Sequence, residues 1–163
     1  MEPIAVTADD YNALFDMFRD ETDRGAAVLA GSFVENYLGI YLQNRQVDSS
    51  LSKKIFSSTG PLSTFEQRID FAQAFGFLPR TVCRELHLVR KIRNHFAHHP
   101  KSSSFKEAPV SDWASALATS ATVKSKLGKD FRLEDGKTAF LVSCGVAYVI
   151  MQDIGNGAAA RGA

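Results

Sequence analysis

The stretch DRGAAVLAGSFVENYLGIYLQNR, residues 23–45, decides how this chain folds. Its apolar residues lie almost all round a helix, which predicts a central, buried helix. Gly31 and Gly39 each cost roughly 1 kcal/mol against Ala inside a helix, so we expect close packing of neighbouring helices to compensate. The stretch therefore predicts a helical core in which other helices surround residues 23–45.

Further helical patterns lie on both sides of this stretch, and no run alternates with the period of a strand. A Ser63–Glu66 capping box opens one helix, for which Gly76 is the expected stop. This helix should bury Phe75. The predicted helices besides 23–45 begin at Thr7 and cover 64–76, 80–98, 111–121 and 137–154. The sequence predicts an all-α, single-domain helical bundle of about five main helices over residues 1–155, with a disordered tail at 156–163.

The overall charge argues against one class of partner. The chain has 163 residues, with 19 basic and 18 acidic side chains and a formal net charge of +1. Strong binding to duplex DNA usually needs a basic excess or stripe, because neutralising phosphates supplies much of the affinity. No such excess exists here, and only local clusters occur, at Lys53–Lys54 and from Arg84 through Arg93.

The cysteines and the apolar segments indicate the compartment. Cys83 and Cys144 lie far apart, without Cys or His neighbours at zinc spacing, so we expect reduced, buried thiols and no metal or other cofactor. The N-terminus lacks the basic region and apolar run of a secretion signal. The longest apolar run, 138–151, is too short to span a bilayer. These features predict a cytoplasmic protein without a membrane segment.

The stretch LVRKIRNHFAHHP, residues 88–100, carries the clearest chemistry. On a helix, Arg90, Asn94 and His98 are spaced by four and line one face, and Arg93 turns partly toward the apolar stripe. An Arg can hold a phosphate, and a His with a pKa near neutrality can transfer a proton, as RNA cleavage requires. Acid and base roles need two groups, so such a site would need a two-fold dimer.

The same residues could instead form a structural latch, that is, a set of polar contacts that holds neighbouring helices together. On chemistry alone this interpretation is favoured. His98 lies in the last turn, where it can bond to orphan carbonyls and favours the helix dipole. Arg93 and Asn94 would then be buried polar groups, satisfied by acids on neighbouring helices such as Glu35, Asp70 or Asp23.

Other polar residues belong to the same candidate network. Asp23 suits the N-terminal dipole of its helix, and Arg24 could pair with Glu21 or with a distant acid. Arg68 and Asp70 diverge on one helix, so we expect them to reach different neighbours, at least one of which is Arg93 or Asn94. A polar network that links helices is the main interpretation of this set, and a ligand pocket is the alternative.

Three segments resemble the mannitol operon repressor family: DRGAAVLAGSFVENYLG (23–39), GPLSTFEQRIDFAQAFGFLP (60–79) and LHLVRKIRNHFAHH (86–99). Their order and spacing match as well, so the resemblance covers roughly residues 20 to 100. It implies an all-helical, cytoplasmic bacterial regulator without an obvious helix-turn-helix. The near-neutral charge favours regulation through a protein partner over direct operator binding.

A broader resemblance concerns Arg93-Asn94-x-x-x-His98, which has the form seen in helical domains of the HEPN superfamily. Some of these domains are dimeric, metal-independent ribonucleases. The resemblance implies that Arg93 would bind the scissile phosphate, His98 would be the acid or base and Asn94 would assist. Many HEPN-like domains bind rather than cleave, so this chemistry remains the competing hypothesis.

Together these observations predict a regulator that acts by binding and forms a homodimer, with a protein partner or nucleic acid as its target. The surface around Arg90, Arg93, Asn94 and His98 is the predicted functional patch. The two alternatives are a ribonuclease that uses Arg93 and His98, and a structural or adaptor domain in which these groups only tie helices together.

Overall fold

The computed structural model of the chain describes residues 8–101, 103–118, 120, 122–124 and 135–161. These residues form seven α-helices and one 3-10 helix, with no strand among them. The helices are α1 (Ala8–Arg19), α2 (Asp23–Gln43), η1 (Ser49–Leu51), α3 (Ser52–Ile55), α4 (Phe65–Ala74), α5 (Arg80–His98), α6 (Val110–Ala118) and α8 (Gly136–Arg161). The predicted all-α class is confirmed. The predicted count of about five main helices is too low, partly because α3 is a single turn with no amphipathic pattern.

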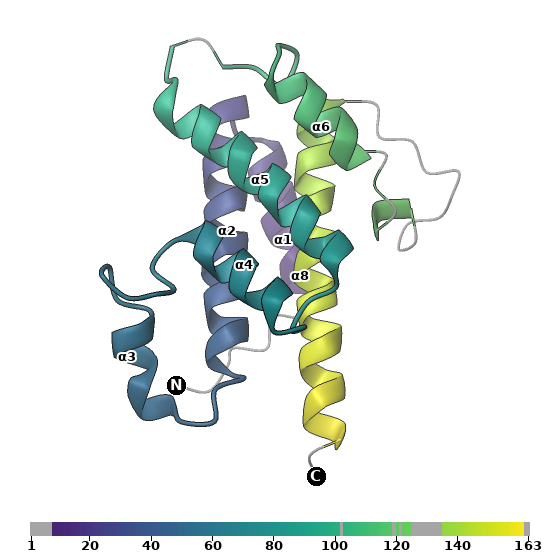
Figure 1. Cartoon of the computed structure of the whole chain (residues 1–163). Helices are drawn as coiled ribbons and strands as arrows, with labels where there is room; N and C mark the ends of the chain where they lie inside the picture. Colours follow the sequence, from purple (N-terminus) through teal and green to yellow (C-terminus); the bar gives the residue numbers. More distant parts are fainter. Residues whose placement is uncertain (1–7, 102, 119, 121, 125–134, 162–163) are drawn as a thin grey trace.

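Helix α2 has the central place that its composition predicted. It contacts α1, α4, α5 and α8, and its small residues Ala26, Ala27 and Ala30 are at most 1% exposed. Helices α2 and α8 run lengthwise beside each other, and α5 crosses both (Figure 1). One hydrophobic cluster joins buried side chains of α2, α4, α5, α6 and α8. Most of the apolar surface of α2 is buried, but one stripe of the helix, which includes Leu29, Asn36 and Ile40, stays exposed.

Helix α4 begins one residue later than predicted and ends at Ala74, two residues before the predicted end, while the stop at Gly76 is where the sequence predicted it. The N-cap is Thr64, which forms a capping box with Gln67, not Ser63 with Glu66 as predicted. The prediction was wrong by one residue because the adjacent positions carry the same chemistry: a hydroxyl followed three residues later by Glu or Gln. At the other end Gly76 has a φ of +67°, and the N–H of Phe77 donates to the Ala72 carbonyl at 2.8 Å, which is a Schellman stop.

Helix α5 presents one apolar stripe and one polar face. The stripe residues Val82, Leu86, Val89 and Phe96 are all buried, together with Ile92. The helix ends at His98, before Pro100, because a proline disfavours helical geometry at the residue that precedes it. The burial of this stripe fixes the rotation of α5 and so decides which polar residues meet α4 and α2.

Helix α8 is longer than predicted and includes most of the tail. It runs to Arg161, past the predicted end at 154, and the tail predicted to be disordered from 156 is helical as far as Arg161. Gly155 and Gly157, which disfavour a helix, are followed by Ala158–Ala160, and Ala has the best helix propensity of any residue. The segment Gly136–Gly157 has a mean hydropathy of 1.4, enough by length and composition for a membrane span, and 56% of it is buried inside the structure. Core helices of soluble proteins have the same character.

Both cysteines are expected to be unreactive in the folded protein. Burial raises the pKa of Cys83 to about 11 and raises the pKa of Cys144 further, so little thiolate forms at pH 8. We expect a chromogenic disulfide reagent to modify neither thiol at pH 8 in buffer and both in denaturant. Rapid modification of either thiol in the native protein would contradict the buried positions of both side chains.

Candidate functional site

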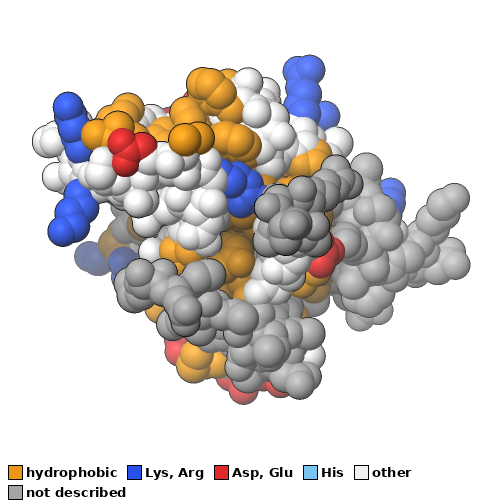
Figure 2. Space-filling view, turned by 90° about the horizontal axis from the view of Figure 1, so that it is seen from below, with side chains coloured by type: hydrophobic (Ala, Val, Ile, Leu, Met, Phe, Trp, Pro, Cys, Tyr) orange, Lys and Arg blue, Asp and Glu red, His pale blue; other side chains and the backbone are white. Residues whose placement is uncertain are grey.

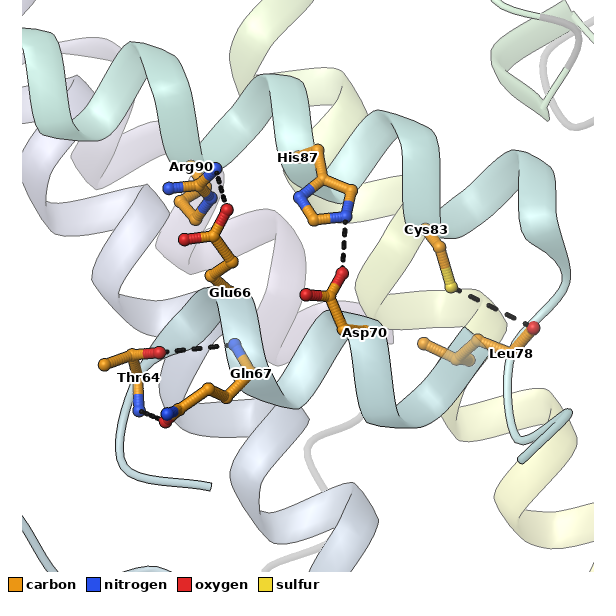
Figure 3. A network of polar contacts seen from close by, with 8 residues as sticks. All are labelled: Thr64, Glu66, Gln67, Asp70, Leu78, Cys83, His87 and Arg90. Carbon is orange, nitrogen blue, oxygen red and sulfur yellow. Dashed lines mark hydrogen bonds and ion pairs between the residues drawn. The ribbon is translucent and has the colours of Figure 1, made fainter. Parts of the chain in front are cut away.

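Two polar contacts join α5 to α4 along the face that the sequence marked (Figure 3). Arg90 Nη2 donates to Glu66 Oε1 at 2.9 Å, and His87 Nε2 lies 3.2 Å from Asp70 Oδ1. Both carboxylates are more than half exposed, whereas Arg90 and His87 are less exposed. The contacts lie at the solvent-facing edge of the α4–α5 interface, so each contributes little to stability.

Arg93 occupies the centre of the network and turns to α2 instead. Its Nη2 donates to Glu35 Oε2, and the side chains are only 20% and 24% exposed. Its guanidinium carbon lies 5.8 Å from the centre of the Phe65 ring on α4. Glu35 was one of the acids predicted from the sequence as a possible partner of Arg93, and these two residues form an ion pair in the structure. Arg93 therefore ties α5 to α2 beside α4.

Gly31 makes room for this pair. A Cβ built on Gly31 would lie 2.7 Å from both Cβ and Cγ of Arg93, closer than side-chain carbons approach. Gly31 and Glu35 are four residues apart and share one face of α2. The stem of Arg93 rests on the glycine, and its guanidinium reaches the carboxylate one turn further along. The close packing predicted at Gly31 thus has a specific partner.

Arg68 and Asp70 reach different neighbours, as their spacing predicted. Arg68 Nε donates to the Leu62 carbonyl at 2.9 Å and Nη1 to the Glu35 carbonyl at 3.3 Å, while Asp70 faces His87. Among the described residues, no hydrogen bond or ion pair joins either side chain to Arg93 or Asn94, so the predicted polar link to these two residues is not present. The sequence missed His87 as the partner of Asp70 because it lies outside the Arg93–His98 pattern.

The C-terminal end of α5 is open. His98 is exposed and Asn94 is half-buried, and neither side chain forms a hydrogen bond or ion pair with another described residue. The histidine that bonds to a helix carbonyl is His99, whose Nδ1 lies 2.9 Å from the His95 carbonyl oxygen, and not His98 as predicted. The His95 and His99 rings stack at 4.3 Å, and burial, followed by the charge of His99, lowers the pKa of His95.

Asp23 and Arg24 stand apart from this network. Asp23 Oδ2 accepts from the Phe105 N–H at 3.2 Å and from Ser104 Oγ at 3.3 Å, so it holds the loop between α5 and α6. Arg24 is exposed and forms no ion pair with a described residue. The structure thus brings together Arg90, Arg93, Glu35, Arg68 and Asp70 around α4 and leaves Asp23, Arg24 and His98 outside.

The geometry favours a latch over a phosphate site. A phosphate that approached Arg93 would have to compete with Glu35, a carboxylate that already accepts from Nη2 of the guanidinium in a partly desolvated setting. In the described residues, no group of three or more His, Cys, Asp or Glu side chains is arranged to hold a metal ion.

Comparisons with known proteins add no family to this picture. No protein-family model, no curated protein and no solved structure matches the chain. The interpretation of the site therefore depends on the residues and their geometry.

The sequence also missed a buried carboxylate, Glu85 on α5, whose side chain is 6% exposed. Burial raises its pKa, although hydrogen bonds from Thr122 and Ser120 and the charge of Arg84 oppose the shift. The folded state then holds a proton more tightly than the unfolded state, so stability falls as pH rises above the ordinary pKa of a glutamate. The ionised carboxylate destabilises the fold at neutral pH.

We therefore expect Glu85→Gln to raise the unfolding temperature at pH 7, and to do so much less at pH 4, where the carboxyl is largely protonated. Thermal unfolding followed by circular dichroism at both pH values measures the effect. Glu107→Gln, which changes an exposed glutamate, is the matched control and should alter neither value. An unchanged or lower unfolding temperature at pH 7 would show that the Glu85 charge is fully compensated.

Proposed function

We propose that this chain is a transcriptional regulator of the mannitol operon repressor type that acts by binding and not by catalysis. The observation that carries the proposal is the internal pairing of Arg93 with Glu35. An arginine that holds a substrate phosphate needs free guanidinium donors, and Arg93 already uses Nη2 to bind Glu35. The conspicuous polar pattern of α5 is then a device that fixes the helices.

The mode of binding follows from charge and fold. With a net charge of +1 the chain lacks the basic excess of a strong DNA-binding module, so we propose that it regulates through a protein partner. We further propose that it is a single-domain, cytoplasmic homodimer whose α8 belongs to the core rather than to a membrane. The apolar character of α8 is consistent with a core helix because α1, α2, α5 and α6 all contact it.

The direct test is genetic. Deleting the gene for this chain in its own organism should raise transcripts of the mannitol uptake and utilisation genes several-fold, and the wild-type gene should restore repression. A gel shift at low salt with the corresponding promoter then separates the two routes, because a protein-mediated regulator should not retard the DNA alone. Unchanged transcripts in the deletion strain would remove the mannitol assignment.

A second candidate, a metal-independent ribonuclease, is favoured by one observation: His98 is exposed on the same helix as Arg93. We expect the wild-type protein to leave labelled single-stranded RNA intact in EDTA. Cleavage that disappears in a folded His98→Ala variant would reverse the ranking of the two functions.

A third candidate is an adaptor or structural domain, and the helix-linking contacts of Arg90, Arg93 and His87 favour it. Such a domain would leave mannitol transcripts unchanged on deletion and would not cleave RNA. Light scattering behind a sizing column tests the proposed homodimer for all three candidates.

A further inference from the structure

A pocket of about 530 Å³ opens between the end of α2, α3 and α4. Its volume lies within the range of small-molecule sites. Most of its wall is apolar, from Leu42, Ile55, Phe56, Pro61, Leu62, Phe71, Ala74, Phe75 and Phe77. The polar side chains in the wall are Arg45, Gln46, Gln67 and Asp70. The sequence did not predict this pocket, because no motif marks it.

Arg45 is the only Lys or Arg among the described residues that line the pocket. Its Nη1 donates to the Tyr41 carbonyl at 2.9 Å, and its guanidinium carbon lies 3.4 Å from the centre of the Tyr41 ring. It forms no ion pair with a described carboxylate, and its buried Nη2 has no hydrogen-bond partner. The one carboxylate of the wall, Asp70, faces His87 instead. Arg45 is thus a cation beside an apolar pocket without a counter-ion from the described residues.

One apolar side chain of the pocket wall is largely exposed. Phe75, predicted to be buried, is 65% exposed, and its ring lies 4.4 Å from that of Phe71. The view of the molecule from below shows hydrophobic side chains at the surface close to Lys and Arg side chains (Figure 2). Exposing a phenylalanine at the rim of an apolar pocket costs stability, and a ligand that covered it would recover that energy.

We propose that this pocket binds a small amphipathic carboxylate. The apolar body of the ligand lies among Phe56, Phe71 and Phe77, and its carboxylate pairs with Arg45. An arginine with unused donors recognises a carboxylate through charge-assisted hydrogen bonds, while the walls offer almost nothing to a polar body. The site is independent of the proposed regulatory function, because it is formed by other residues than those around Arg93.

Calorimetric titration with decanoate and decanol, both below the concentrations at which they aggregate, tests the proposal. The two probes share an apolar chain and differ in the charge of the head. We expect the wild-type protein to bind decanoate about tenfold more tightly than decanol, the size of effect typical of one charge-assisted hydrogen bond. Arg45→Gln should abolish this preference and leave decanol binding unchanged.

Two further variants separate the pocket from general effects. Ala74→Phe places a large side chain in the wall, at an exposed position, and should abolish binding of both probes while the unfolding temperature stays near that of the wild type. Arg24→Gln removes an exposed arginine at the other end of α2 and should bind both probes like the wild type.

Three results would overturn the proposal. The first is equal wild-type affinity for the two probes, or no binding of either. The second is a preference for decanoate that survives Arg45→Gln. Arg45 would then serve only to bond the Tyr41 carbonyl at the C-terminal end of α2. The third is binding to vesicles of phosphatidylglycerol but not to free decanoate, which would make the surface a lipid contact and not a pocket for a free carboxylate.

Discussion

Replacing Glu35 by Ala is expected to lower the free energy of unfolding by about 2–4 kcal/mol, because it leaves the charge of Arg93 partly buried and unpaired. Both side chains are less than a quarter exposed, so water cannot fully replace the lost carboxylate. The Nε of Arg93 already lacks a partner in the described structure, which makes the guanidinium more dependent on Glu35. Denaturant unfolding followed by circular dichroism measures the change.

Glu66→Ala is the matched control for this experiment. It removes a carboxylate from the other arginine pair of α5, at Arg90, but Glu66 is 55% exposed. The loss should therefore stay below about 1 kcal/mol, as for surface ion pairs. Losses of equal size at Glu35 and Glu66 would show that the Arg93 pair is no more protected from water than the Arg90 pair.

A double variant asks whether the charges themselves are needed. Glu35→Leu with Arg93→Met replaces the pair by apolar groups and removes the unpaired charge that makes each single change costly. We expect it to recover most of the stability lost in Glu35→Ala. A double variant that folds and still represses would show that Arg93 only holds α5 against α2. A double variant that folds but no longer represses would show that Arg93 takes part in binding.

Much of the fold could be predicted because its helices carry strong local signals. The apolar stripe of α5 and the nearly uniform apolarity of α2 each follow from a period that a single segment shows by itself. The Gly76 stop was equally local, since few other residues adopt its positive φ. The start of α4 was wrong by one residue because Ser63 and Thr64 offer the same hydroxyl chemistry.

The candidate site was harder to predict because its contacts join separate helices. Glu35 could be named as a partner of Arg93, but Asp70 and Asp23 were equally acceptable until the helix rotations were known. The burial of Phe75 was predicted from its spacing on α4, yet α4 ends at Ala74 and the stop at Gly76 leaves that ring at the surface. The pocket beside Arg45 lies between three elements, and no motif or periodicity in the sequence predicts a cavity of this kind.

Gly31→Ala is expected to lower the free energy of unfolding by about 1–3 kcal/mol, the cost of overpacking a close contact. Alanine should favour a helix over glycine by roughly 1 kcal/mol, so the change would stabilise α2 if space allowed. The added Cβ would lie 2.7 Å from Cβ and Cγ of Arg93. These atoms lie close to the backbone of α5, so relief requires α2 and α5 to move apart.

Gly39→Ala, on the same helix, separates this clash from helix propensity. The nearest atom to its new Cβ is Nη1 of Arg68 at 3.2 Å, the far end of a flexible side chain that can shift by a few tenths of an ångström. Gly39→Ala should therefore change stability little or raise it by up to about 1 kcal/mol. Equal losses at the two glycines would contradict a specific contact at Arg93.

The stability losses of the Gly31 and Glu35 variants should not be additive, because both changes act on the same arginine. Once Gly31→Ala has displaced the stem of Arg93, its guanidinium is no longer held against Glu35, and removing that carboxylate costs less. We expect the Gly31→Ala/Glu35→Ala variant to lose less stability than the sum of the single variants, by about 0.5–3 kcal/mol. A strictly additive result would mean that α2 holds the stem and the charge of Arg93 independently, and the latch would then be two separate contacts.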